Sequence, residues 1–197
     1  MREYFVKSVD SLAWEEIPKA PIDNFDWEDK GYEPVCFAQL ANVKGKGLAV
    51  KLTAYESNPL AVKKNYDDQV CEDSCLEFFV SFDSNEDYVN FETNSIGTLL
   101  AHVHFGGKKM LIDKLISIPE IKTEKTADYW SVEYMLSKDY IKKLSKGFML
   151  ESGKSFNANF YKCGDKTEKP HYGMWNKINH STPSFHQPAQ FGKIIIE

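Results

Sequence analysis

Hydrophobic and polar residues alternate with a period of two along most of the chain. Such runs occupy residues 35–40, 48–55, 74–82, 88–94, 98–105, 129–136, 155–161 and 191–196. Because successive side chains of a strand point to opposite faces, each run predicts a β-strand with one hydrophobic face. The Lys-Gly-Lys-Gly stretch at 44–47 predicts a hairpin between the first two runs.

One segment departs from this period. Residues 138–145 predict a short helix, with Ser137 as its N-cap and Gly147 as its C-terminal stop. Since nearly every other element is a strand at short spacing, the sequence predicts an all-β fold: an antiparallel β-sandwich, jelly-roll-like, with one short connecting helix. No repeat or linker divides the chain, so we expect a single domain over residues 1–197, on which residues 1–33 pack as an N-terminal arm.

Composition narrows the function classes. The 197 residues carry 24 Lys+Arg against 29 Asp+Glu, a net charge of −5 that argues against a nucleic-acid partner. The first residues lack an apolar leader core and no apolar run reaches about 18 residues, so we expect no membrane span and a cytoplasmic protein unless a signal was trimmed. Aromatic residues make up 14%, which suits strands and flat ligand platforms.

Polar side chains recur on the outward faces of the expected strands. Carboxylates, carboxamides and rings share these rows, which include Tyr55, Glu77, Glu92, Asn94 and Asn159. Rings can stack on the C–H faces of a sugar while carboxylates and amides bind its hydroxyls, so the rows indicate carbohydrate binding. The alternative is that these are ordinary solvated strand faces.

Other chemistry has weaker support in the sequence. Glu77 and Glu92 are candidates for the carboxylate pair of a glycoside hydrolase, although no acid/base signature flanks them. His102 and His104 share a strand face and would be the ligands in a haem or other cofactor-binding sandwich. No phosphate loop, nucleophile elbow or zinc-protease motif is present, so we expect no enzyme.

Several motifs in order resemble carbohydrate-binding modules of family 9. Residues 72–79 read EDSCLEFF, similar to the family's D-(S/D)-x-E-x-F strand, and residues 88–97 follow its Y-x-x-F-x-x-N-x-x-G pattern. Residues 130–133 match W-x-x-E, and the stretches from 159, 175 and 183 are similar to the closing N-F-Y-(R/K), Trp and P-x-x-F-G motifs. The resemblance covers about residues 35–197.

This resemblance implies a non-catalytic sugar-binding β-sandwich, often appended to xylanases and often holding structural calcium. Trp175 matches one of the two Trp rings that clamp a terminal sugar in the family, Glu77 its Glu and Asn94 its Asn. The other Trp would fall near residues 70–71, where no aromatic stands, and Glu92 occupies the Arg position. The oxygen-rich turn formed by Asp83 and residues 85–87 suits calcium, or is a solvated turn.

We therefore expect binding of a mono- or oligosaccharide, such as one from xylan, in polysaccharide catabolism, by a monomer without nucleic acid or membrane partners. No cofactor is required by the residues themselves. The expected site consists of Tyr55, Glu77, Glu92, Asn94, Asn159 and Trp175.

Overall fold

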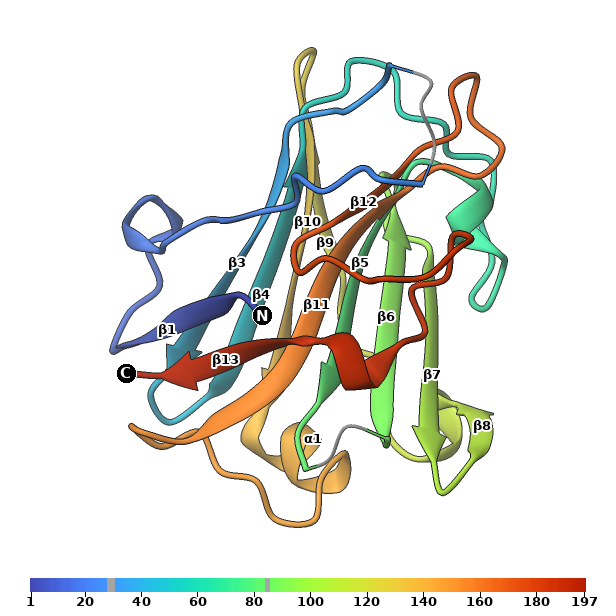
Figure 1. Ribbon diagram of the computed structural model, residues 1–197. Helices are drawn as coiled ribbons and strands as arrows, with labels where there is room; N and C mark the ends of the chain where they lie inside the picture. The colour runs from blue at the N-terminus through green and yellow to red at the C-terminus, as the bar shows by residue number, and fades with distance from the viewer. Residues whose placement is uncertain (28–30, 84–85) are drawn as a thin grey trace.

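The computed structural model describes residues 1–27, 31–83 and 86–197, and its regular structure is nearly all β (Figure 1). The strands are β1 (Glu3–Val9), β2 (Ala20–Pro21), β3 (Cys36–Val43), β4 (Gly47–Ala54), β5 (Cys75–Ser81), β6 (Tyr88–Asn94), β7 (Leu99–Phe105), β8 (Lys108–Leu111), β9 (Lys122–Lys125), β10 (Trp130–Ser137), β11 (Ser155–Cys163), β12 (Tyr172–Met174) and β13 (Gly192–Ile196). The helix α1 spans Lys138–Lys143, and 3-10 turns lie at η1 (Trp14–Glu16), η2 (Val70–Glu72), η3 (Ile112–Lys114) and η4 (Pro188–Gln190).

The strands form one sheet that curls over into two layers. Its order is β8-β7-β6-β5-β11-β13-β1-β3-β4-β10-β9, with β12 and β2 added beside β11 and β3. β1 joins the layers, because its first half pairs in parallel with β13 and its second half in parallel with β3 (Figure 1). The predicted β-sandwich is confirmed, as is the hairpin of β3 and β4. Residues 3–9 of the expected N-terminal arm are instead a strand within the sheet.

The space between the two layers holds the main hydrophobic core. Phe78, Phe91 and Phe160 stack across three adjacent strands, with ring centroids 5.4–6.3 Å apart. Trp130 faces them from β10 and is fully buried. The hydrophobic faces predicted from the alternation therefore point inward here, where these rings are removed from water.

The outward face of β5 and β6 departs from the prediction. Every residue of both strands is buried, including the polar ones. A second hydrophobic cluster covers this face, formed by Phe79, Tyr161 and Phe185 together with Phe191 and Met174 from the C-terminal segment. A solvated strand face was the alternative interpretation of these rows, and it is wrong here since residues 172–191 lie over them.

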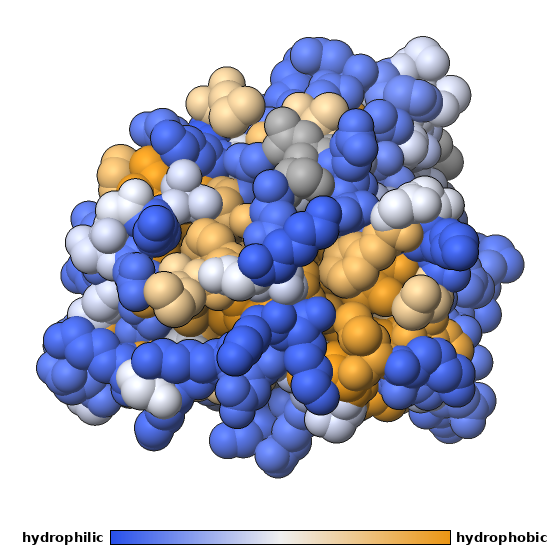
Figure 2. Space-filling model, turned by 90° about the horizontal axis from the view of Figure 1, so that it is seen from below, coloured by the Kyte–Doolittle hydropathy of each residue, from blue (hydrophilic) through white to orange (hydrophobic). Residues whose placement is uncertain are grey.

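The short helix forms where the sequence predicts one. The Ser137 hydroxyl oxygen accepts a hydrogen bond from the Tyr140 backbone N–H, as an N-cap does. α1 ends at Lys143, two residues before the predicted end, and Gly147 follows with a φ of +110°. This end of the sandwich is viewed in Figure 2, where hydrophilic side chains surround smaller apolar areas.

Three further observations concern the described residues as a whole. All four cysteines are free thiols. Among residues 1–27, 31–83 and 86–197, no helix is long and apolar enough to cross a membrane. Over the same ranges, no group of three or more His, Cys, Asp or Glu side chains is arranged to hold a metal ion.

Candidate functional site

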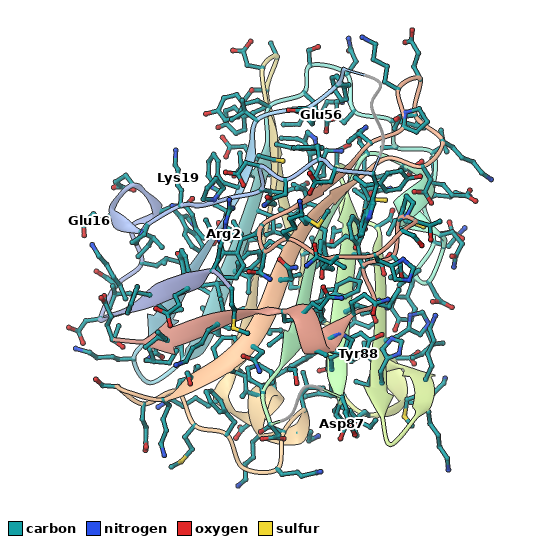
Figure 3. All side chains as sticks on the ribbon, viewed as in Figure 1. Arg2, Glu16, Lys19, Glu56, Asp87 and Tyr88 are labelled. Carbon is teal, nitrogen blue, oxygen red and sulfur yellow. The ribbon has the colours of Figure 1, made fainter. Side chains whose placement is uncertain are left out.

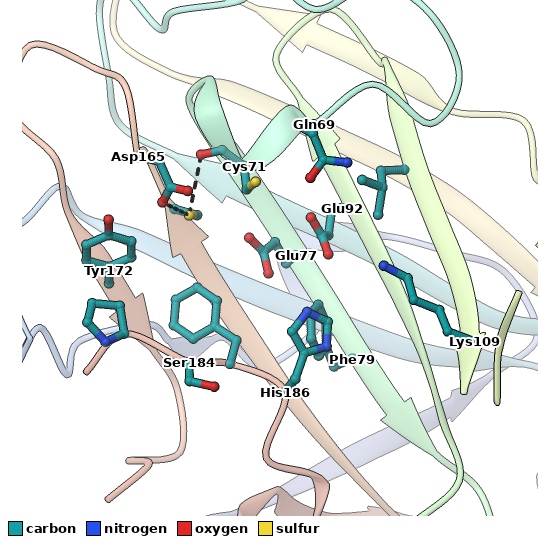
Figure 4. A pocket seen from close by; sticks show the side chains of 14 residues that line it. Gln69, Cys71, Glu77, Phe79, Glu92, Lys109, Asp165, Tyr172, Ser184 and His186 are labelled. Carbon is teal, nitrogen blue, oxygen red and sulfur yellow. Dashed lines mark hydrogen bonds between the residues drawn. The ribbon is translucent and has the colours of Figure 1, made fainter. Parts of the chain in front are cut away.

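A cavity of about 250 Å³ lies between the outward face of the β5–β6 layer and the C-terminal segment (Figure 4). Its base is formed by strands, and its walls come from the loop around η2 and from residues 183–186. The lining side chains are Gln69, Cys71, Glu77, Phe79, Glu92, Leu100, Lys109, Cys163, Asp165, Tyr172, Pro183, Ser184, Phe185 and His186.

Glu77 and Glu92 form the base of this cavity. They are directly opposite each other in the antiparallel β5–β6 ladder, so their side chains rise from the same face of the sheet. Figure 4 shows the two carboxyl groups side by side in the pocket. Glu77 is 2% exposed and Glu92 is 5% exposed, so both reach only the space of the cavity.

Burial dominates the ionisation of this pair. It raises the pKa of Glu92 to about 7, with the Asn90 hydrogen bond and the Lys109 ammonium opposing the rise. The pKa of Glu77 is raised well above its usual range by burial and then by the neighbouring Glu92 and Asp165. The pair therefore holds its protons to a higher pH than exposed carboxyl groups do, and a protonated carboxyl both donates and accepts hydrogen bonds.

A polar network extends from Glu92 toward the lower end of β6. The Asn90 amide N–H donates to Glu92 Oε1 at 2.8 Å, and Asn90 Oδ1 accepts from His104 Nε2 at 2.9 Å. The His104 ring stacks on Tyr88 with centroids 4.2 Å apart, and Tyr88 Oη lies 2.8 Å from His186 Nδ1. These contacts fix the orientation of the side chains next to the carboxyl pair.

Aromatic rings form the wall that faces the carboxyl pair. Phe185 stacks on Tyr161 with ring centroids 4.0 Å apart, and the Tyr161 hydroxyl donates to the Phe185 backbone oxygen. The Tyr172 ring lies edge-on to the Phe185 ring. The Trp27 ring also contacts Phe185, with ring centroids 5.5 Å apart. The half-exposed Tyr172 is thereby positioned at the mouth of the cavity.

Sequence comparison assigns the chain to a family. Residues 7–196, nearly the whole chain, match the family described as Carbohydrate-binding family 9. The chain belongs to carbohydrate-binding family 9. This confirms the resemblance seen in the motifs, and the members of that family are non-catalytic carbohydrate-binding modules.

Solved structures agree with the family assignment. A candidate carbohydrate-binding protein from Bacteroides uniformis is 26% identical with a TM-score of 0.85, over 100% of this chain and 99% of that one. A family 9 module from Caldicellulosiruptor kristjanssonii, solved in complex with glucose, shares 12% identity and a TM-score of 0.70, over 100% and 96% of the chains. Its complex with cellotriose gives 13% identity and 0.67, over 100% and 94%. The comparison with curated proteins finds no relative of this chain.

The family 9 fold places the six residues expected in the site at different locations. Only Glu77 and Glu92 line the cavity. Asn94 is buried and ties a loop in place, because its amide N–H donates to the Lys63 carbonyl and to Asp73. Asn159 is also buried, and its amide exchanges hydrogen bonds with the Asn176 backbone.

The two expected aromatic contacts also lie elsewhere. Trp175 is 2% exposed and packs in the main core against Tyr4 and Phe160. A Cβ on Gly192 would come within 2.3 Å of the Trp175 ring, so the ring occupies space that only a glycine leaves open. Tyr55 is 47% exposed, but it lies on the layer of the sandwich that is remote from the cavity, where it contacts Tyr129. The structure therefore does not bring these rings to the carboxyl pair.

Sequence reasoning missed most of the cavity wall. Tyr172, Phe185 and His186 belong to the long segment 164–190, from which the sequence analysis took only Trp175 as a site residue. A loop of such length inside a small domain is itself a functional signal. Lys109 was also missed, because it reaches the cavity from the exposed strand β8, whose residues show no clear alternation.

Side chains that were considered for calcium and haem bind other groups of the protein. Asp83 accepts from the Lys146 backbone N–H and Asp87 from that of Gly106, so these oxygens already have partners. Asn85, the other member of the expected calcium turn, lies outside the described residues. His102 Nε2 lies 3.2 Å from Asp67, and His104 is held by Asn90 as above.

Proposed function

We propose that this chain binds the terminal residue of a carbohydrate in the cavity above Glu77 and Glu92, without cleaving it. The observation that carries the proposal is a pair of buried carboxyl groups at the base of a cavity with aromatic rings in its wall. Sugars present hydroxyls and apolar C–H faces together, and this cavity offers partners for both.

The chemistry of the pair suits hydroxyl groups. A protonated carboxyl donates through its O–H and accepts through its carbonyl oxygen, and a hydroxyl can do the same. Two opposed carboxyls would thus hold two neighbouring hydroxyls in a fixed geometry. Tyr172 and Phe185 would contact the apolar face of the ring, as aromatic side chains in ligand pockets do.

The size of the cavity limits the ligand. About 250 Å³ lies just below the roughly 300–1,000 Å³ that is typical of pockets for drug-sized molecules. We infer that one sugar residue enters and that the rest of a chain, if present, extends past Tyr172 into solvent. The complexes of the Caldicellulosiruptor kristjanssonii module with glucose and cellotriose support a saccharide ligand for this fold.

The proposed site differs from the one expected from sequence. It keeps Glu77 and Glu92, and it adds Tyr172, Phe185 and Lys109. Asn94, Asn159 and Trp175 support the fold around the site, and Tyr55 lies apart from it. A source in xylan and a place in polysaccharide catabolism remain proposals, as does the monomeric state.

Titration calorimetry tests the proposal. Glucose, xylose, cellotriose and a xylo-oligosaccharide are titrated into the full chain, and we expect at least one to bind. Tyr172→Ala should weaken binding by about tenfold, the effect of one aromatic contact worth ~1.5 kcal/mol. Tyr55→Ala is the control, an exposed Tyr on the other layer, and should leave binding unchanged. Equal loss in both variants, or no binding by any sugar, would contradict the proposed site.

The hydrolase hypothesis uses the same two carboxyls. A retaining or inverting glycosidase needs one ionised carboxylate beside one acid, whereas here burial raises the pKa of both groups. This favours binding over cleavage. Incubation with activated aryl glycosides checks the point, and turnover that disappears in Glu77→Gln would overturn it.

A further inference from the structure

The cavity above Glu77 and Glu92 is rich in carboxyl groups. Among its lining residues that the structure describes, three carry carboxyl groups, Glu77, Glu92 and Asp165, and only Lys109 carries an ammonium. Lys109 reaches in from the exposed strand β8, and Figure 4 shows it at the Glu92 side of the pocket. Ionisation of either glutamate would leave negative charge in excess in this cavity, and that excess favours a ligand that brings positive charge.

Glu77 lacks a strong hydrogen-bond donor. It is 2% exposed, and its neighbouring hydrogen-bond group is the thiol of Cys163, a weak donor. Its carboxyl points into the cavity (Figure 4), and the groups that lower its pKa are Lys162, which pairs with Glu56, and the Cys163 thiol. A buried carboxyl without such a partner is costly, so a ligand that supplies donors gains from filling this position.

A protonated amine is the complementary group. An ammonium has three donors and no acceptor, and a pair of carboxylates has acceptors only. A neutral sugar hydroxyl offers one donor to the same site. On the basis of the function proposed above, we propose that the cavity selects a sugar with a free protonated amino group, a hexosamine, over a neutral sugar of the same size.

Binding of such a sugar has a defined proton balance. Burial favours the protonated form of the pair in the empty cavity, since it raises the pKa of Glu92 to about 7 and that of Glu77 well above its usual range. When an ammonium enters, one carboxyl becomes a carboxylate, and its proton passes to the buffer. A neutral sugar needs no such release, because a protonated carboxyl already serves its hydroxyls.

Other titratable groups surround the pair. They are Asp67 and Cys71 around η2, Tyr88 on β6, His102 on β7, Lys109 on β8, Lys162, Cys163 and Asp165 at the end of β11, Tyr172 on β12 and His186 in the C-terminal segment. Burial raises the pKa of Cys71 and of Tyr88 to about 12 and lowers that of His102, so these three groups stay neutral near pH 7. Replacement of each Glu by Gln then identifies the source of a released proton.

The experiment compares three sugars of one scaffold on the full chain. Glucosamine, glucose and N-acetylglucosamine are titrated at pH 7 in two buffers of different ionisation enthalpy. We expect glucosamine to bind at least about tenfold more tightly than the other two, and to release up to one proton per site. Between pH 5 and 7 its affinity should rise as the carboxyls ionise. Glu77→Gln and Glu92→Gln should each remove the preference, while the exposed Glu120→Gln should keep it.

The outcomes separate this inference from the function on which it rests. If glucose and glucosamine bind equally and without proton release, the cavity is a sugar site but not an amine site, and the inference is wrong. If no sugar binds, the proposed function fails with it. A calcium titration in parallel guards against a metal site: calcium binding that is lost in Glu77→Gln, with glucosamine silent, would overturn the inference. Circular dichroism confirms that each Gln variant is folded.

Discussion

Among the described residues, glutamate side chains are buried in two regions, and their surroundings differ in opposite ways. Glu56, near the upper end of the sandwich in Figure 3, contacts the ammonium of the fully buried Lys162 at 3.3 Å. It also accepts from Trp130 Nε1 at 2.8 Å, from the Ser74 hydroxyl at 3.0 Å and from the Tyr32 hydroxyl at 3.1 Å. Glu77 and Glu92 have no cation in contact among the described residues and face a cavity instead.

The pKa values follow this difference. Burial alone would raise the pKa of Glu56, but Lys162, the Trp130 indole and the other donors outweigh it, so the pKa lies below its usual range. Burial raises the pKa of Glu77 and Glu92 because nothing comparable opposes it. A buried acid that the protein itself satisfies stabilises the fold, whereas one left open to a cavity is available to a ligand.

Lys162 also determines which ring nitrogen of His171 carries the proton. Its ammonium has only donors, so His171 Nε2, 2.7 Å away, must accept, and the Nδ1–H of His171 then donates to the Lys169 carbonyl. Burial and then Lys162 lower the pKa of His171 to about 4, which keeps this imidazole neutral at pH 7. The Glu56 region is thus a closed network of satisfied groups.

The largest expected effect is a break in this network. Lys162→Met would leave the Glu56 carboxylate buried without its cation, and we expect a loss of about 3–5 kcal/mol in the free energy of unfolding. Urea denaturation at pH 7 measures it. The exposed Lys154→Met is the matched control and should change stability by less than about 0.5 kcal/mol.

A double variant sharpens this result. Lys162→Met combined with Glu56→Gln removes both charges, and it should recover part of the loss because no unpaired charge remains. If Lys162→Met alone leaves the free energy of unfolding unchanged, then the Lys162 ammonium does not stabilise the buried Glu56 carboxylate. The contrast with Glu77 and Glu92 would then be wrong.

The stability contributed by Glu77 and Glu92 should depend on pH in the opposite sense. The folded-state pKa of Glu92 is about 7 and the unfolded one about 4.5, so the folded state binds more protons between these values. Stability contributed by the protonated group is therefore present below pH 4.5 and is lost as the pH rises through 7. Glu92→Gln cannot ionise, so it should flatten this decline and gain up to about 3 kcal/mol at pH 8.

Glu56 provides the control for this pH dependence. Its pKa is lowered, so its contribution to stability is present above pH 4.5 and is lost as the pH falls through the lowered value. Glu56→Gln should thus weaken the protein at pH 7 and flatten the acid side of the profile. Urea midpoints of both variants from pH 3 to 9 measure the two effects. Profiles of the same sign would show that the regions are electrostatically alike.

Much of the fold could be predicted from the sequence, because a period of two is a local signal. The inward row of Phe78 and its partners, and the N-cap at Ser137, were correct for this reason. β1 was missed as a sheet member, since its place depends on parallel pairing with β13, almost two hundred residues away.

The candidate site was predictable only in part. Glu77 and Glu92 lie on one face because strand alternation dictates it, but alternation cannot say whether that face meets water or a covering segment. The motif match placed Trp175 at the ligand, whereas the close approach of Gly192 lets its ring enter the core. A contact between positions so distant in sequence produces no periodic pattern from which it could be predicted.

The smallest effect uses two cysteines as reporters of the two regions. Burial, followed by the charges of Glu77 and Glu92, raises the pKa of Cys71 to about 12, so this partly exposed thiol should react slowly with iodoacetamide at pH 8. In Glu92→Gln we expect the alkylation of Cys71 to be about two- to tenfold faster. The variant removes the Glu92 charge, which raises the pKa of Cys71, and each unit of pKa changes the thiolate fraction tenfold. Cys36 is buried, and its neighbours are Lys162 and Glu56, so its rate should not change.

Mass spectrometry of tryptic peptides measures each site separately. Equal acceleration at both thiols would indicate general loosening of the fold, while acceleration at Cys71 alone, suppressed again by a saturating sugar, would mark the acid pair as the region that meets the ligand.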